Sequence, residues 1–370
     1  MSRSSSRAPA ALAGGLDPWL LAGLLALAAI GLAILYGASG GNADLVLRQA
    51  ARFGLGVALM LVAARLPPGL LLSWTPWLYG GAVVLLVLVA LLGEGRGAHR
   101  WLDLGVVRFQ PSEVAKLALP MMLAWVLHGQ PLPPRWPVLI MLAVLIAVPT
   151  LLIGQQPDLG TAVLVAASGA FVVFLAGLSW RWIIAAGALA VAAAPVLWYF
   201  MHDYQRNRVR TFLDPESDPL GQGWNIIQSK IAVGSGGLHG KGWMSGTQSQ
   251  LDFLPEHTTD FVFAVFAEEF GFVGVVAMLA LYGFIIGRTL VIAGAARHTY
   301  GRLLAGSIAL TFGIYVLING AMVAGLLPVV GVPMPLVSYG GTSAVTLLLG
   351  FGLVLSVHRH HRQSMPGGGL

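Results

Sequence analysis

The chain has 370 residues, of which 57% are hydrophobic and only 10% are charged. A soluble domain carries about 25% charged residues, so this composition excludes a soluble enzyme, a disordered chain and a fibrous protein. One membrane span needs about 20 apolar residues, and the hydrophobic content is enough for about ten spans. The absence of cysteine excludes disulfides, thiolate nucleophiles and cysteine-ligated metals. The net charge of +6 fits cationic loop ends that face anionic lipid headgroups.

Hydrophobic periodicity predicts an all-α polytopic membrane protein with about ten transmembrane helices. The second and fourth are short for a full crossing, which is tolerated where protein surrounds the end of a span. The first follows Arg3 and Arg7 as in a signal peptide, but its long apolar stretch and the spans behind it favour an uncleaved anchor. The expected spans are 18–37, 50–64, 70–92, 113–128, 137–154, 161–178, 182–201, 261–287, 302–326 and 341–357.

An even number of spans places both termini on the same side of the membrane, and we expect that side to be the cytoplasm. The cytoplasmic segments then hold ten Lys and Arg residues against six in the outer segments, once the one long outer loop is left aside. We predict a single membrane-embedded domain over 18–357, with cytoplasmic tails at 1–17 and 358–370. No internal repeat is visible in the sequence, which weakens the alternative of an inverted-repeat transporter.

The largest soluble feature is the outer loop expected at 202–260, between the seventh and eighth spans. Its stretch from Trp224 to Gly234 places Ile226, Ile227 and Ile231 on one side of a helix. Such an amphipathic helix suits a position on the membrane or on the bundle. A connection of this length with its own periodicity is usually functional.

Glu113 and Lys116 are ionisable residues at the start of the fourth span, where Ser112 is placed to cap the helix. They are three positions apart and therefore share a helix face. One interpretation is a self-neutralising pair at the interface. The other is a site that faces a cavity, since ionisable groups inside spans usually mark one. Lys116 would then meet an anionic group, and Glu113 would orient it or hold a metal.

Four arginines are expected on the outer side of the membrane. Arg48 and Arg52 lie four residues apart at the mouth of the second span, and Arg208 and Arg210 alternate in the long loop. An extended segment would point the last two the same way. Contacts with lipid headgroups and a solvated loop are the simpler interpretations. Together with Lys116, however, these cations suit a diphosphate, which Arg binds in a bidentate fork.

Asp260 directly precedes the apolar run that opens the eighth span. It is placed to cap that helix, which is the default role for an acid at this position. An acid at a helix mouth beside a cationic groove is also a candidate general base. Glu268 and Glu269 lie about two turns further along, where acids are costly, and we expect a structural role for them.

Prolines and glycines make residues 331–343 an irregular segment that opens the tenth span. Irregular backbone at membrane depth is tolerated where it lines a cavity or is buried in protein. Ser338, Gly340 and Thr342 offer amides and hydroxyls for a phosphate at a helix N-terminus, and a plain re-entrant turn is the alternative. Residues 155–160 form a similar polar break, and the His- and Arg-rich 358–362 suit a charged tail better than a metal site.

Several of these runs together resemble one known family. Gly240–Trp243, Gly246–Gln250 and Phe253–Glu256 running into Asp260 resemble the SEDS family, the shape, elongation, division and sporulation proteins that polymerise peptidoglycan. The first two runs are more similar to its elongation branch than to its division branch. Further matching runs are Gln110–Glu113 with Lys116, Gln156–Thr161, Arg208–Pro215 and Ser338–Ser343, and the resemblance extends in order from about residue 20 to 357.

There is one departure from the family pattern. Thr258 stands where that pattern has a histidine, so the role of the histidine does not carry over to this chain. Asp260 keeps its place in the pattern.

The resemblance implies a peptidoglycan glycosyltransferase of the bacterial cytoplasmic membrane that polymerises lipid II with inversion at the donor sugar, in cell elongation and cell-shape maintenance. Asp260 would take the proton of the acceptor 4-hydroxyl, and undecaprenyl diphosphate would leave. Arg48, Lys116, Arg208 and Arg210 would hold diphosphates, aided by a divalent cation, Mg²⁺ or Mn²⁺, with no organic cofactor. The family works with a class B penicillin-binding protein and other membrane proteins of the elongation complex.

Two rival functions would use the same residues differently. A lipid II flippase also needs a cavity with cations for a diphosphate, but it has no need of a base at one membrane face. A non-catalytic scaffold for cell-wall enzymes would leave Glu113, Lys116 and Asp260 without a purpose. Nucleic acid is not an expected partner.

Overall fold

The computed structural model describes residues 15–92, 101–103, 108–156, 158–201, 203–218, 221–250, 253–254 and 256–363. Long helices dominate this part of the chain, and a two-residue antiparallel hairpin, β1 (Leu102–Asp103) with β2 (Arg108–Phe109), lies between two of them. The long helices are α1 (Pro18–Ala38), α2 (Ala43–Ala63), α3 (Pro68–Leu92), α4 (Pro111–His128), α5 (Trp136–Gln155), α6 (Leu159–Leu175), α7 (Trp180–Phe200), α11 (Val262–Ala295), α12 (Thr299–Val323) and α13 (Thr342–Gln363).

Each of the expected spans coincides with one of these helices, which confirms the all-α polytopic fold. Within the described residues, seven helices are long and apolar enough to cross a membrane, namely α1, α2, α3, α5, α11, α12 and α13. Helix α6 is apolar but has only 17 residues. The full count of ten crossings stays a prediction.

Two helices start earlier than expected in a way that changes the place of predicted site residues. Helix α2 begins at Ala43 rather than at residue 50, because the side chain of Asn42 accepts a hydrogen bond from the Leu45 amide at 3.2 Å and caps it. Helix α4 begins at Pro111, a residue that favours the first helical position. Ser112 therefore lies inside α4 instead of capping it, and Arg48 lies inside α2.

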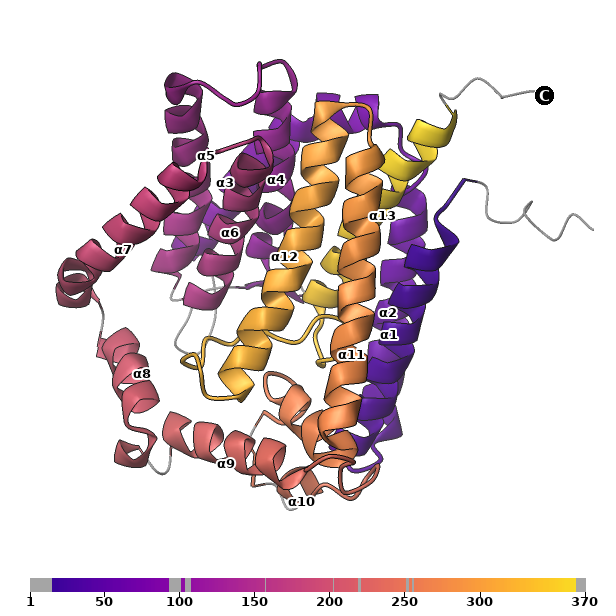
Figure 1. Ribbon diagram of the computed structural model, residues 1–370, viewed down its shortest axis with the longest axis vertical. Helices are drawn as coiled ribbons and strands as arrows, with labels where there is room; N and C mark the ends of the chain where they lie inside the picture. Colours follow the sequence, from indigo (N-terminus) through magenta and orange to yellow (C-terminus); the bar gives the residue numbers. More distant parts are fainter. Residues whose placement is uncertain are drawn as a thin grey trace, which may run out of the picture.

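Helix α12 runs through the middle of the bundle and packs against α11, α6, α4 and α13 (Figure 1). The rings of Tyr282, Phe312 and Phe351 join α11, α12 and α13, with centroids 5.6 Å and 5.0 Å apart. Such aromatic pairs contribute about 0.5–1.5 kcal/mol each beyond the area they bury. The Tyr282 hydroxyl also donates to the Pro335 carbonyl at 2.6 Å, so this core holds the irregular segment before α13 in place.

A glycine allows α1 to approach that segment closely. A Cβ atom on Gly31 would lie 2.2 Å from the Leu336 carbonyl oxygen, a distance that no side chain tolerates. Small residues permit such close backbone contact in membranes, where van der Waals packing rather than the hydrophobic effect joins helices.

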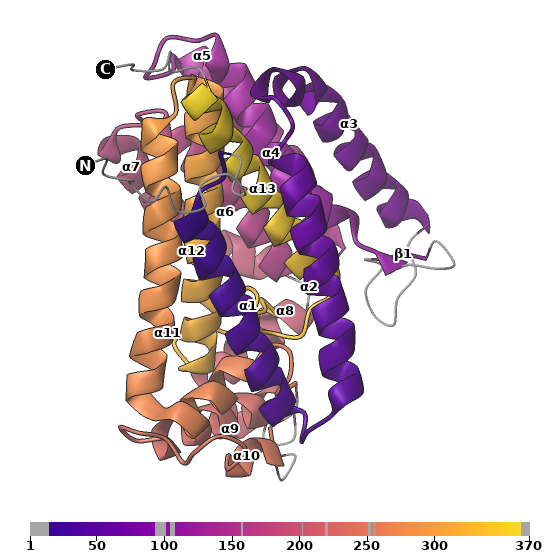
Figure 2. The same cartoon turned by 90° about the vertical axis from the view of Figure 1, so that its right-hand side faces the viewer.

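The segment between α7 and α11 folds into helices at one end of the bundle: α8 (Asp203–Leu213), the 3-10 turn η1 (Pro215–Ser217), α9 (Gln222–Ser235) and α10 (Thr247–Gln250). Helix α9 lies across the lower end of α11 and α12, and Figure 2 shows the same arrangement from the side. It is the predicted amphipathic helix. Ile226 is buried whereas Ile231 is 46% exposed, so α9 packs on the bundle through only part of the expected face.

Candidate functional site

A cavity of about 970 Å³ opens among α2, α4, α6, α12, α13 and the segment 331–343. Its volume lies at the upper end of the range for small-molecule pockets. Of the predicted site residues, Glu113, Lys116, Gly340 and Thr342 line it, and so does Arg52. These residues come from three predicted motifs, and a fourth, the polar break at 155–160, contributes Asp158 to the wall.

Lys116 is the centre of a buried polar cluster in this wall. Its Nζ atom lies 2.7 Å from Glu113 Oε1 and donates a hydrogen bond at 2.7 Å to the Tyr315 hydroxyl. An ammonium group has three N–H donors, so one remains for a ligand in the cavity. The second carboxylate oxygen of Glu113, Oε2, is buried and has no hydrogen-bond partner in the described structure. The two expected alternatives therefore coexist, because the ion pair forms and it also lines a cavity.

Arg52, on α2, adds a second cation to the wall of this cavity. Its guanidinium lies 4.7 Å from the centre of the Tyr339 ring, and its Nη1 atom is 3.5 Å from Gln49 Oε1. Arg48 is one turn earlier on α2, is exposed, and is not among the cavity-lining residues. The pair thus shares a helix face as expected, but only Arg52 reaches the cavity.

This difference predicts unequal mutant effects. With the glycan polymerisation that the family resemblance implies as the readout, Arg52→Ala is expected to lower the rate by about tenfold or more, because the expected charge-assisted contact with phosphate would be lost. Arg52→Lys should be milder, since it keeps the charge and loses only the fork. Arg48→Ala serves as the matched control on the same helix. Equal losses in Arg48→Ala and Arg52→Ala, measured as initial rates on lipid II, would contradict the assignment of the cavity wall.

The segment 331–343 forms the edge of the cavity and is not a plain turn. Gly340 and Thr342 line the cavity, and Thr342 begins α13, whose first amides face no helical acceptor. Ser338 has another role, because its buried hydroxyl accepts a hydrogen bond from the Met334 amide at 2.8 Å. Its side chain therefore stabilises the turn instead of lining the cavity.

Asp260 lies beside this edge, where α11 begins. The Cβ position of Gly331, a cavity-lining residue, is 3.5 Å from Asp260 Oδ2. The Asn319 side chain, on α12, donates to the carbonyl oxygens of both Asp260 and Val332 at 2.8 Å. The Tyr339 amide donates to the Thr258 carbonyl at 2.8 Å. Because backbone atoms make this last contact, it does not require the histidine of the family pattern.

The expected capping role of Asp260 is wrong. Phe261 is the N-cap residue of α11, and α11 has no side-chain cap. The Asp260 carboxylate therefore makes no capping hydrogen bond to the first turn of α11. Burial raises the pKa of Asp260 to about 6, the charge of Glu256 adds to this, and Arg208 opposes it. The carboxylate is therefore mainly ionised at neutral pH, but it is more basic than an ordinary aspartate.

The two loop arginines do not point the same way as predicted. Residues 203–213 form helix α8 instead of an extended segment, and in a helix two residues that are two apart lie on different faces. Arg208 acts electrostatically on Asp260. Arg210 lies 5.9 Å from the Trp198 ring centre and is exposed. Arg208 is therefore part of the charge environment of Asp260, whereas Arg210 contacts Trp198 instead.

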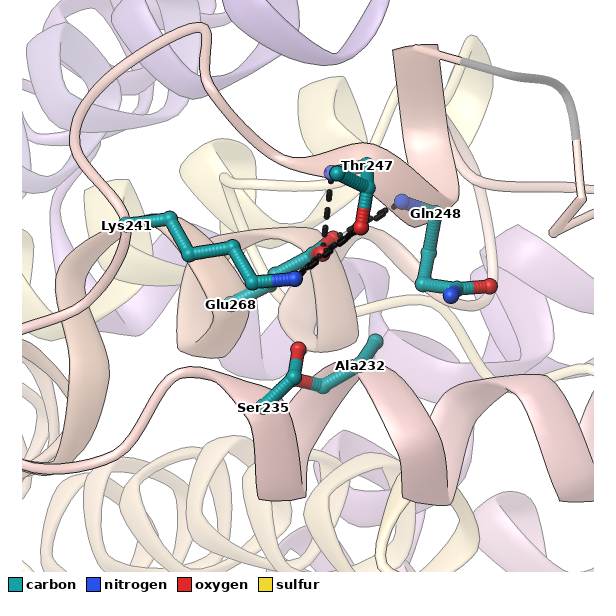
Figure 3. A network of polar contacts seen from close by, with 6 residues as sticks. All are labelled: Ala232, Ser235, Lys241, Thr247, Gln248 and Glu268. Carbon is teal, nitrogen blue, oxygen red and sulfur yellow. Dashed lines mark hydrogen bonds and ion pairs between the residues drawn. The ribbon is translucent and has the colours of Figure 1, made fainter.

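Glu268 and Glu269 hold the loop before Asp260 onto α11, which confirms their structural role. Figure 3 shows Lys241, Thr247 and Gln248 converging on Glu268. The Lys241 ammonium is 2.6 Å from Glu268 Oε1, and the Thr247 amide donates to the same oxygen at 2.9 Å. Glu269 accepts from the Met244 amide at 3.1 Å. Gly271 ends this short first part of α11 with a φ of 64°, a left-handed conformation that glycine adopts without strain.

Three residues of the site were missed from the sequence. Tyr315 and Asn319 are polar groups one turn apart in a long apolar span, and that depth is the signal that could have found them. Asp158 was noted only as part of a polar break. Its Oδ1 atom accepts from the Thr161 amide at 3.1 Å and caps α6, while Oδ2 accepts from Gln110 Nε2 at 3.1 Å.

The carboxylates in the cavity wall are candidate ligands for a divalent cation. Among the described residues, no group of three or more His, Asp and Glu side chains is arranged to hold a metal ion. Mg²⁺, however, usually binds through one or two carboxylates together with substrate phosphates and water. Glu113, with its unpartnered oxygen, and Asp158 both line the cavity, so the residues present fit a cation that arrives with a diphosphate.

Known proteins resemble the chain over nearly its whole length. A relative in Escherichia coli, named peptidoglycan glycosyltransferase MrdB, is 53% identical over 349 residues, which cover 94% of each protein. A Helicobacter pylori protein of the same name is 36% identical, over 85% of this chain and 83% of that protein.

Solved structures of known proteins also resemble this chain. A structure of a peptidoglycan synthase complex that coordinates polymerization and crosslinking matches with a TM-score of 0.82 and 38% identity, covering 94% of this chain and 99% of that one. The crystal structure of the rod shape determining protein RodA of Thermus thermophilus matches with a TM-score of 0.72 and 34% identity, over 94% and 98%. The family of cell cycle proteins that comprises FtsW, RodA and SpoVE matches residues 16–363. The chain therefore belongs to the FtsW/RodA/SpoVE family, the SEDS family that its motifs resemble, and shares its fold with RodA.

Proposed function

We propose that this peptidoglycan glycosyltransferase joins lipid II units into β-1,4 glycan strands by an inverting reaction, with Asp260 as the general base. The observation that carries the proposal is the position of Asp260. Its uncapped carboxylate lies against Gly331, at the edge of a cavity whose wall contains Lys116 and Arg52. A base and a diphosphate-binding wall are thus next to each other.

The reaction needs both the general base and the cationic cavity wall. The 4-hydroxyl of the acceptor N-acetylglucosamine attacks the anomeric carbon of the donor, and its proton passes to Asp260 as the new bond forms. The bond from the anomeric carbon to the diphosphate breaks, and undecaprenyl diphosphate leaves with both bonding electrons. Lys116 and Arg52 offset the charge of the leaving diphosphate, and fixed charges lower a barrier most where charge develops. Arg208 supplies a further positive charge close to Asp260, and Gly340 and Thr342 offer donors at the edge of the cavity.

The setting follows from the same proposal. The chain lies in the bacterial cytoplasmic membrane with both termini in the cytoplasm, so that Asp260 and α8 to α10 face outward, where lipid II is used. A class B penicillin-binding protein is the proposed partner, which agrees with the similarity to a synthase complex of polymerization and crosslinking. Cell elongation is the proposed context, since relatives in the RodA group are named for rod shape.

The direct test separates polymerisation from transport. Purified chain, alone and with its partner, is incubated with lipid II, and the products are separated by length. Long glycan strands are expected. If lipid II instead crosses the bilayer of reconstituted vesicles and no strand forms under any partner condition, the flippase function replaces this one.

The pH dependence of the rate should report Asp260. A general base works in its deprotonated form, and burial raises the pKa of Asp260 to about 6. The initial rate is therefore expected to rise with pH through about 6 and to level off above about 7. The measurement is the polymerisation rate from about pH 5 to about pH 8 at saturating lipid II. A rate that stays flat over this range would place the base elsewhere.

We also propose that a divalent cation, Mg²⁺ or Mn²⁺, accompanies the diphosphate at Glu113. When bound, such an ion supplies further positive charge to the leaving group. Chelation is expected to lower the polymerisation rate, and adding Mg²⁺ or Mn²⁺ should restore it. An undiminished rate in excess chelator would leave Lys116 and Arg52 as the only cationic stabilisation in the cavity wall.

A further inference from the structure

A second cavity, of about 330 Å³, lies at the other end of the bundle from Asp260. The residues that line it come from the first turns of α3 and α12 and the last turns of α4 and α13, which lie together at one end of the bundle (Figures 1 and 2). Its floor is apolar, with Pro68, Leu72 and Val357. Its volume falls within the range of ligand pockets, and the proposed transferase reaction makes no use of it.

The rim of this cavity carries one arginine and three histidines and is rich in hydrogen-bond donors. Arg297 and His298 come from the loop before α12, His128 closes α4, and His360 comes from α13. His360 Nδ1 lies 2.9 Å from the Ser356 carbonyl, which leaves Nε2 as a donor when the ring is protonated. His298 is the N-cap of α12 and gives it no side-chain hydrogen bond, so the first amides of that helix also remain for an anion.

The walls are held in place by contacts of their own. The buried Tyr300 hydroxyl lies 2.9 Å from Thr75 Oγ1 and joins the start of α12 to α3. The cavity is therefore a built feature between helices rather than a gap between loose loops.

Tryptophans mark the depth of this cavity in the membrane. Exposed indole rings occur in the first two turns of α1, α3, α5 and α7, which all begin at this end of the bundle (Figure 1). Exposed tryptophans are typical of the headgroup level of a bilayer. The residues are Trp19, Trp74, Trp136 and Trp180.

We propose that this cavity binds an anionic phospholipid from the leaflet on the side of the chain termini. The phosphate lies at Arg297, His298 and the first amides of α12, and an acyl chain follows the apolar floor. Basic pockets between transmembrane helices bind anionic headgroups in this way. A rim with one arginine and several histidine donors, an apolar floor and a position at headgroup depth together fit a lipid better than a soluble anion.

The test uses the full-length protein, purified in a non-ionic detergent, and native mass spectrometry to count bound lipid. The probes are dioctanoyl phosphatidylglycerol, dioctanoyl phosphatidylcholine and glycerol 3-phosphate. We expect phosphatidylglycerol to bind at least about tenfold more tightly than either other probe. Equal binding of phosphatidylcholine would overturn the anionic headgroup, and equal binding of glycerol 3-phosphate would overturn the lipid.

Two variants place the bound lipid in this cavity. Gly69 lines it and has open space around its Cβ position, so we use Gly69→Leu to place a side chain at the cavity wall. Gly81 is on the same helix with equally open space and lies outside the cavity, which makes Gly81→Leu the matched control. Gly69→Leu should weaken phosphatidylglycerol binding by about tenfold, and Gly81→Leu should leave it unchanged.

A second pair of variants tests whether the positive charge at the rim of the cavity contributes to binding. Arg297→Gln should weaken binding, whereas Arg65→Gln, at an exposed arginine that does not line the cavity, should not. Unchanged binding in both Gly69→Leu and Arg297→Gln would show that the lipid binds elsewhere, for example in the larger cavity.

Discussion

Asp260→Asn is expected to reduce the rate of glycan polymerisation by at least about 10²-fold, because a positioned general base contributes about 10²–10⁴-fold to such a step. Asparagine keeps the size of the side chain but has no basic oxygen. The backbone contacts around this residue, from Asn319 and between Thr258 and Tyr339, do not involve the carboxylate and should persist. Binding of lipid II and of the partner is therefore expected to remain.

The fold of this variant should not suffer. Burial raises the pKa of Asp260 above its usual value, so at neutral pH the ionised side chain opposes folding, and neutral asparagine removes that cost. The melting temperature of Asp260→Asn should equal or exceed that of the parent. Asp260→Ala should lose no capping energy, since α11 has no side-chain cap.

Asp214→Asn is the matched control, because Asp214 is exposed in the same segment between α7 and α11. It should polymerise lipid II at the parent rate. If Asp260→Asn also works at the parent rate, Asp260 is not the base.

Lys116 should be equally essential, for a different reason. Lys116→Met removes the cation of the cavity wall that is closest to Glu113, and polymerisation should fall by at least about 10²-fold as the charge of the leaving diphosphate is left unmatched. It also leaves Glu113 buried without its partner, which costs about 3–5 kcal/mol of stability for a fully buried pair. A loss of activity in this variant alone would therefore not distinguish a slower chemical step from a less stable fold.

The double variant Glu113→Gln/Lys116→Met separates the two effects. It removes both charges, so its melting temperature should recover most of what Lys116→Met loses, while polymerisation stays abolished. Lys116→Arg, which keeps the charge in a different shape, should retain more activity than either. Parent-level polymerisation by the stable double variant would remove Lys116 and Glu113 from the site.

The sequence predicted the helices well, because long apolar stretches in a membrane protein have few alternatives to a helix. The amphipathic α9 and the chemistry-bearing motifs around Lys116, Asp260 and residues 338–342 were equally visible. The segment around Arg208 and Arg210 was expected to be extended but is part of helix α8, since a short polar segment has no apolar pattern and its helix is fixed by its surroundings.

What the sequence determined by itself was a polytopic membrane protein, its family, and the residues that carry its charges at membrane depth. These are properties of composition and local pattern. Only the tertiary structure decided which charges meet. Tyr315 is 199 residues from Lys116 and Asn319 is 59 from Asp260, and no local period links such distant partners. The cavity wall, the choice of Arg52 over Arg48, and the freedom of Asp260 from a capping role all depend on how helices pack side by side, because side-chain neighbours across helices are set by packing and not by spacing along the chain.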